Sequence, residues 1–113
     1  MNASFRFRRQ SCKPLLDVTV RLTAEPASGF TVRISPGVLN SLEPPMIRAV
    51  VLGVASAFVA IESVQPVAVS VIEVTDHSGS TSELGLNTCA AGAAYHLLGF
   101  PELAPHSGAT AEA

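Results

Sequence analysis

Charged residues are scarce in this sequence, and that scarcity restricts the class of protein it can be. Lys, Arg, Asp and Glu make up 14% of the 113 residues, whereas 48% are apolar. This composition excludes disorder for the body of the chain, and the length predicts one domain. A domain of this size buries only about two-thirds of its unfolded surface. We therefore expect a second copy or another partner to cover part of its apolar surface.

Long apolar runs and cysteine-rich patterns are also missing. The longest uncharged apolar run, residues 49–61, is shorter than the ~20 residues that a membrane-spanning helix needs. Residues 1–9 are basic but no apolar stretch follows them, so we expect no secretory signal. Cys12 and Cys89 stand far apart, which gives no disulfide framework. These absences predict a protein of the reducing cytoplasm with no membrane partner.

Catalytic and cofactor-binding motifs are absent as well. No glycine-rich loop is followed by Gly-Lys-Ser/Thr, so we expect no nucleotide binding. Asp76, His77 and Ser78 have the residue types of a nucleophilic triad, but three consecutive turn residues cannot aim at one another. No histidine has a carboxylate or a cysteine at ligand spacing. The sequence therefore predicts no enzyme, no cofactor and no metal.

What the sequence does contain is clear alternation of apolar and polar residues, which is typical of strands. It predicts strands at residues 5–10, 16–23 and 30–34, arranged as an antiparallel meander. A fourth strand is predicted at 67–75. Its end carries apolar residues on both faces, so either both faces are covered there or a bulge shifts the register.

Two helices are predicted by apolar residues that recur at steps of three and four. The first spans about 44–61, with prolines in its first turn, and is apolar on nearly every side. We expect it to be buried on more than one side, with Gly53 and Ala57 leaving room for a close neighbour. The second runs to about residue 98, where Gly99 stops it, and its buried seam is predicted to consist of Leu84, Thr88, Ala91, Tyr95 and Leu98. Ser80 and Glu83 have the spacing of a capping box at its start.

The order of elements is β-β-β-α-β-α. It predicts an α+β two-layer sandwich in which one sheet carries two helices on one face. Residues 1–100 form the single domain in this interpretation. Residues 101–113, rich in Pro, Ala, Ser and Gly, are predicted to be a flexible C-terminal tail.

The basic residues are unevenly distributed. The net charge of −2 is not typical of a nucleic-acid-binding protein. Yet four of the seven basic residues fall within the first 13 positions, namely Arg6, Arg8, Arg9 and Lys13. All nine acids follow them in the sequence. The cluster is either a solvated edge strand that is protected from aggregation or a surface that neutralises phosphates.

Residues 33–57 contain ISPGV and PPMIRAV, residues 77–84 read HSGSTSEL, and residues 9–11 read RQS. These three segments resemble domain IV of elongation factor G. Residues 33–57 resemble the family's I-x-G-G-V-I-P-x-E-Y-x-P-A-V. Residues 77–84, HSGSTSEL, are similar to H-D-V-D-S-S-E-L without a gap. Residues 9–11, RQS, begin like R-Q-S-G-G-R-G-Q-Y-G-H-V, and Val20 falls on its last position. The likeness spans about 9–99, but CKPLLDV at 12–18 replaces the glycine-rich part.

The resemblance implies a ribosomal protein S5 domain 2-like fold, in which a βαβ unit crosses over left-handedly. It also implies a non-enzymatic translation module that binds the ribosome or structured RNA through two tip loops. The site residues carried over by the resemblance are Arg6, Arg8, Arg9, Gln10, Ser11, Lys13, His77 and Ser78. The alternative is a structural module without RNA binding that self-associates through an apolar helix or sheet face as a homo-oligomer.

Overall fold

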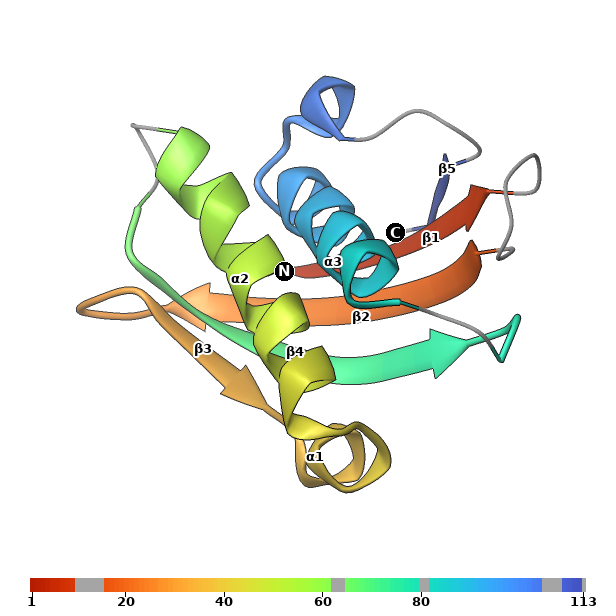
Figure 1. The fold of residues 1–113 in the computed structure, drawn as a ribbon. Coiled ribbons are helices and arrows are strands. Elements are labelled where there is room, and N and C mark those ends of the chain that lie inside the picture. The colour runs from red at the N-terminus through yellow and green to blue at the C-terminus, as the bar shows by residue number, and fades with distance from the viewer. Residues whose placement is uncertain (10–15, 62–64, 80–81, 105–108, 113) are drawn as a thin grey trace.

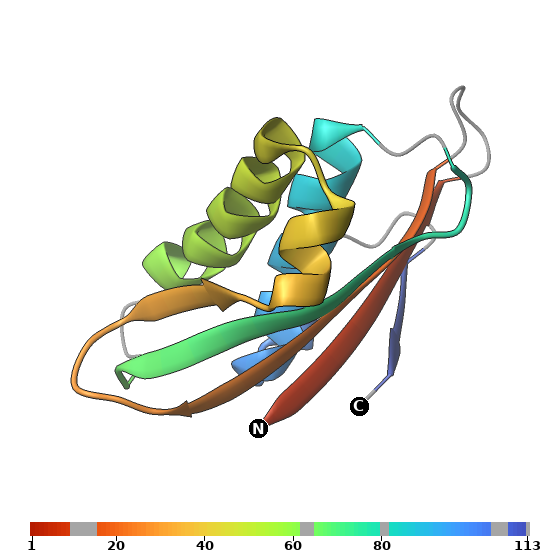
Figure 2. The ribbon, with the colours of Figure 1, turned by 90° about the horizontal axis from the view of Figure 1, so that it is seen from below.

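The computed structural model describes residues 1–9, 16–61, 65–79, 82–104 and 109–112 (Figure 1). A five-stranded mixed sheet in the order β3-β4-β2-β1-β5 forms one layer. The helices lie together on one face of this sheet, and the other face is left open (Figure 2). The prediction of an α+β two-layer sandwich is confirmed.

Strands β1 (Asn2–Arg9) and β2 (Leu16–Pro26) form an antiparallel pair, as expected from their alternation. Every second residue of β2 is buried from Leu16 to Ala24, while the residues between them are exposed or half-buried. The helix-bearing face of the sheet is therefore apolar and the open face polar.

The predicted meander of the first three strands is wrong. Strand β3 (Thr31–Ile34) does not pair with β2; it lies at the edge of the sheet and pairs in parallel with β4 (Val67–Asp76). The reason is burial: Val69 and Val71 of β4 are fully buried, so the most apolar strand takes the position between β2 and β3. Alternation identifies a strand but does not select its neighbour.

Of the two alternatives left open for the end of β4, the structure shows the bulge. Arg21 pairs with Glu73 and Leu22 pairs with Val71, so Ile72 is the extra residue on β4. The bulge explains why apolar residues change face along this strand.

Three helices cover the sheet: α1 (Pro36–Ser41), which the sequence did not predict, α2 (Pro44–Ala60) and α3 (Glu83–Leu97). The expectation that α2 is buried on more than one side is wrong. Leu52 and Val59 are 56% and 82% exposed, because α3 and the sheet cover only one side of α2.

The start and the buried face of α3 also differ from the prediction. The N-cap is Ser82, whose Oγ accepts a hydrogen bond from the Gly85 N–H at 3.1 Å, and Ser80 of the predicted capping box lies outside the described residues. Leu84, expected on the buried seam, is 66% exposed, and Leu86 is buried instead. The helix has apolar and small residues on all its sides, so the spacing of apolar residues alone does not show which side faces the sheet.

Residues after α3 were predicted to be a tail without structure. In the structure a 3-10 helix, η1 (Pro101–Leu103), follows α3, and β5 (Ala109–Glu112) pairs antiparallel with β1. The physical reason is that β1 offers unpaired backbone groups at its outer edge, which a short segment of small residues can satisfy.

Candidate nucleic-acid interface

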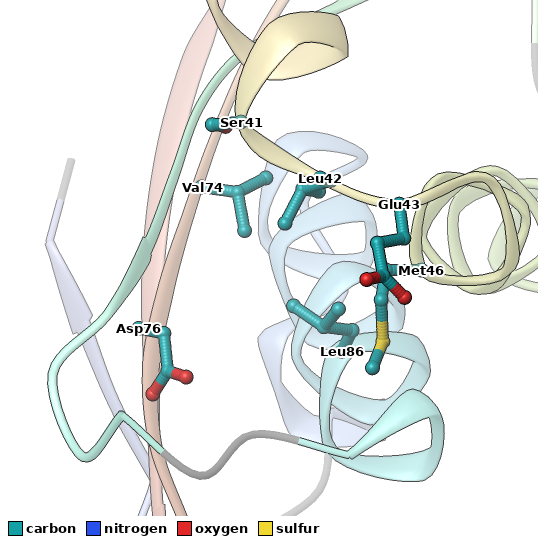
Figure 3. Close-up of a pocket in the computed structure, with 7 residues that line it drawn as sticks. All are labelled: Ser41, Leu42, Glu43, Met46, Val74, Asp76 and Leu86. Carbon is teal, nitrogen blue, oxygen red and sulfur yellow. The ribbon is translucent and has the colours of Figure 1, made fainter.

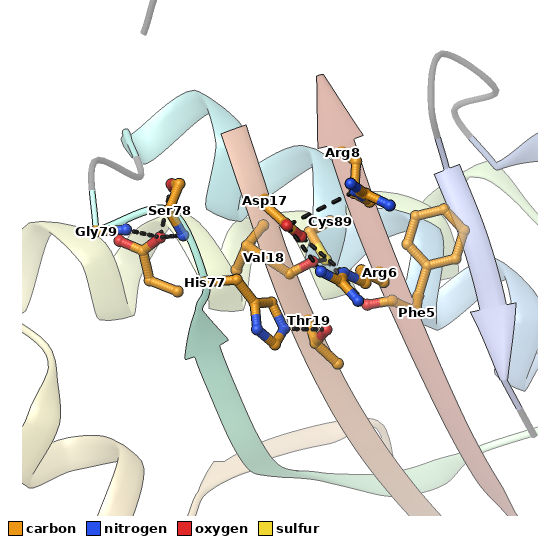
Figure 4. Close-up of polar contacts among 11 residues, drawn as sticks. Phe5, Arg6, Arg8, Asp17, Val18, Thr19, His77, Ser78, Gly79 and Cys89 are labelled. Atoms are coloured by element: carbon orange, nitrogen blue, oxygen red, sulfur yellow. Dashed lines mark hydrogen bonds and ion pairs between the residues drawn. The ribbon is translucent and has the colours of Figure 1, made fainter. Parts of the chain in front are cut away.

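The elements that flank the two predicted tip loops lie at one end of the sheet. The end of β1, the start of β2 and the turn after β4 lie together there (Figure 1). The backbone N–H of His77 donates to the carbonyl oxygen of Asp17 at 2.7 Å. The imidazole Nε2 of His77 lies 2.9 Å from the hydroxyl of Thr19 (Figure 4). We call this end of the sheet the loop end.

Asp17 is the centre of the charged groups at the loop end. Arg6 binds it with two bonds, from Nε to Oδ1 at 2.7 Å and from Nη2 to Oδ2 at 2.8 Å. Arg8 holds its Nε 3.6 Å from Oδ2, an ion pair without a hydrogen bond (Figure 4). The hydrogen bond from Arg6 lowers the pKa of Asp17 below 3.8, and the charges of Arg6, His77 and Arg8 act in the same direction. Asp17 is therefore an anion at neutral pH.

The structure places the predicted site residues in three groups. Arg6 and Arg8 project from the open face of the sheet, where side-chain exposures of 36% and 41% leave them accessible. His77 and Ser78 lie in the turn after β4. The side chain of Arg9, and all of Gln10, Ser11 and Lys13, lie outside the described residues.

Sequence reasoning missed Asp17. Its signal was nevertheless present, since Asp17 is the one acid within the predicted strand 16–23. What was lacking was the register, because only the pairing of Arg8 with Asp17 brings the carboxylate next to both arginines.

The turn after β4 is held by hydrogen bonds to Asp76 rather than by the imidazole of His77. Asp76 Oδ1 accepts hydrogen bonds from the Ser78 backbone N–H, the Ser78 hydroxyl and the Gly79 N–H at 3.1, 2.9 and 2.9 Å. Gly79 has φ +73°, a backbone conformation that glycine adopts readily. Since His77 contacts Thr19 and the Ser78 hydroxyl contacts Asp76, these side chains do not form a triad.

A cavity of about 450 Å³ opens beside the loop end, between the α1–α2 corner, β4 and the start of α3 (Figure 3). Its lining combines apolar side chains with two carboxylates and one hydroxyl: Ser41, Leu42, Glu43, Met46, Val74, Asp76 and Leu86. The Ser41 hydroxyl donates to the Val38 carbonyl at 3.2 Å.

Among the described residues, no three His, Cys, Asp or Glu side chains are grouped so as to hold a metal ion. None of the helices in that part of the chain is long and apolar enough to span a bilayer.

Neither a protein-family model nor a curated protein matches the chain. Its fold resembles a solved structure. The likeness is to the crystal structure of a protein from Thermus thermophilus, with a TM-score of 0.64 and 19% sequence identity. At that identity the comparison shows a shared fold.

The likeness covers 97% of this chain but only 16% of the Thermus thermophilus protein. The same α+β fold is thus a small part of a much longer chain there. Whatever the whole of that protein does cannot be transferred to the 113 residues of this chain.

Proposed function

We propose that this chain is a non-enzymatic module, similar to domain IV of elongation factor G, that binds the ribosome or structured RNA at its loop end. The proposal includes an S5 domain 2-like fold with a left-handed βαβ crossover. The observation that carries it is the contact of His77 with Asp17 and Thr19, which brings the two loop-bearing segments together. In the sequence these segments are some 60 residues apart, and both resemble tip segments of the family.

The charges at the loop end support an interaction with phosphates. Arg6 and Arg8 present guanidinium groups there, and such groups match the geometry of phosphate oxygens. Asp17 opposes the interaction because its carboxylate occupies Arg6 with two hydrogen bonds. We therefore expect binding that is modest in strength and sensitive to salt.

Co-sedimentation with ribosomes in low and moderate salt tests this function. We expect the chain in the ribosomal pellet at low salt, and about tenfold weaker association for an Arg8→Gln, His77→Gln double variant. Arg48→Gln is the matched control, because Arg48 is an exposed arginine on α2, in the helical layer. Absence of the parent chain from the pellet at both salt concentrations would contradict the proposal.

Self-association is a second candidate, favoured by the exposed apolar side of α2. Leu52 and Val59 lie seven residues apart, two turns along the same side of the helix, and both are more than half exposed. The open face of the sheet is polar, so α2 is the surface that would pair. Light scattering is expected to give twice the monomer mass for the parent and the monomer mass for Leu52→Lys, Val59→Lys. A monomeric parent excludes this candidate, whereas a dimer without RNA affinity favours it over the first.

A further inference from the structure

The open face of the sheet has a chemistry of its own. Because alternate residues of each strand point to the same side, the register of the strands fixes its members. Among them are arginines, hydroxyl-bearing residues and acids, including Arg6, Arg8, Asp17, Thr19, Arg21, Thr23, Arg33, Ser70, Glu73 and Thr75. The helices cover the opposite face, so nothing among the described elements lies over these side chains (Figure 2).

Four arginines cross this face along a diagonal. Arg6 and Arg8 stand on β1, Arg21 follows on β2, and Arg33 stands on β3 at the far edge of the sheet. From Arg6 to Arg33 the line crosses three strand spacings and four residue positions, roughly 20 Å in total. Only Arg48 among the arginines with described side chains lies in the helical layer. We call this line the arginine diagonal.

The open face carries no phenylalanine or tyrosine ring, and its one aromatic group among the described residues is the imidazole of His77, which lies at the loop end beside Thr19 (Figure 4). Of the chain's six aromatic residues, Phe5 and Phe7 are buried beneath the helices and Phe30 stacks on Phe58 of α2, with ring centres 4.5 Å apart. Tyr95 lies in α3 and Phe100 follows it. Proteins that bind single-stranded nucleic acid stack successive bases on several aromatic side chains, and a single imidazole at one end of this face offers no such row.

Arginines and hydroxyls without a row of aromatic rings fit the backbone of a double helix. Guanidinium groups bind phosphate oxygens, and threonine and serine hydroxyls can bond to the 2′-hydroxyls that an RNA duplex displays in its shallow minor groove. Recognition of this kind depends on the shape and charge of the duplex rather than on its sequence.

Two acids interrupt the diagonal and limit its strength. Asp17 binds Arg6, and Glu73 Oε2 lies 3.8 Å from Arg21 Nη1. Glu73 is half exposed, and its other oxygen accepts a hydrogen bond from the Thr75 hydroxyl at 3.0 Å, which a glutamine could also accept. Neutralising Glu73 therefore frees Arg21 without removing a structural group.

We propose that the open face of the sheet binds the backbone of an RNA duplex, with Arg21 and Arg33 as contacts beyond the loop end. This inference rests on the proposed RNA-binding function and names the class of RNA and the surface that receives it. It adds two arginines from β2 and β3 that no resemblance to a family assigns.

Fluorescence anisotropy with an RNA duplex of about 20 base pairs, between about 50 and 200 mM salt, tests the proposal. We expect Arg21→Gln, Arg33→Gln to reduce the slope of log affinity against log salt by about 2, because two phosphate contacts are lost. Glu73→Gln should bind the duplex about threefold more tightly, a gain that misfolding cannot produce. Arg48→Gln should behave as the parent does.

Three results would overturn the inference while leaving the proposed function intact. One is ribosome association of the parent chain without measurable affinity for the duplex. Another is duplex binding with a salt slope that neither Arg21→Gln, Arg33→Gln nor Glu73→Gln changes. Tighter binding of single-stranded RNA than of the duplex would also overturn it, since it would place the contacts on another surface. Failure of the proposed function itself is detected separately, by the absence of the parent from the ribosomal pellet.

Discussion

Gly53→Ala is expected to lower the free energy of unfolding by about 3 kcal/mol, at the upper end of the usual penalty for overpacking. Gly53 lies where α2 and α3 approach most closely. A methyl group there would overlap the backbone oxygen of Asn87 and lie 3.0 Å from the Ala90 side chain. A helix backbone cannot rotate away as a side chain can, so the two helices would have to separate. Separation would also weaken the bond from Asn87 Nδ2 to the Ala49 carbonyl.

Gly37→Ala is the matched control, because it makes the same change in another helix. Nothing lies within 4 Å of a methyl group placed at Gly37. Alanine is favoured over glycine in helices, so the control should be unchanged or up to about 1 kcal/mol more stable. Urea denaturation measures the free energy of unfolding of both variants. The melting temperature of the Gly53 variant should also be roughly 10 °C lower than that of the parent. Equal stability of the two variants would mean that the helices are not in close contact at this position.

Loss of stability at alkaline pH is expected from the buried thiol of Cys89. Burial raises its pKa from 9.0 to about 12, and the Sγ lies 3.2 and 3.3 Å from the carbonyl oxygens of Phe5 and Val18. Above pH 9 the unfolded chain releases the thiol proton while the folded chain keeps it. The unfolded state is therefore favoured as the pH rises from 9 to about 12. By pH 11 the loss should be about 3 kcal/mol.

Cys89→Ser removes the titrating group at this position and isolates its effect. Denaturation curves at pH 8 to 11, with both proteins carrying Cys12→Ser, should show that the parent loses stability faster than the serine variant. Other groups that titrate in this range are common to the two proteins, so the difference between them reports Cys89 alone. Parallel pH profiles would contradict a deeply buried, protonated thiol.

Local patterns predicted several parts of the fold well. The alternation in β2, the bulge in β4 and the start of α2 at its two prolines follow from short-range sequence. The room expected beside Gly53 is confirmed by its contact with Asn87 and Ala90. In each of these cases, neighbouring residues in the chain contain the deciding information.

The pairing of the strands and the orientation of α3 were predicted poorly. The meander failed because alternation in β3 is satisfied by β4 as well as by β2, and only burial of the whole sheet selects between them. The buried side of α3 was predicted wrongly because the helix has small and apolar residues on all its sides. The segment at 109–112 gave no strand signal, since its pairing comes from the free edge of β1.

By itself the sequence determined the types of most elements, the sandwich architecture and the presence of basic residues near its start. The tertiary structure decided what those basic residues face. Strand register placed Arg6 and Arg8 against Asp17, and aligned Arg21 and Arg33 with them across four strands of the open face. Such alignments join residues that are distant in the chain. They follow from burial of the apolar face of the sheet under α2 and α3, which fixes the register and leaves the polar face open.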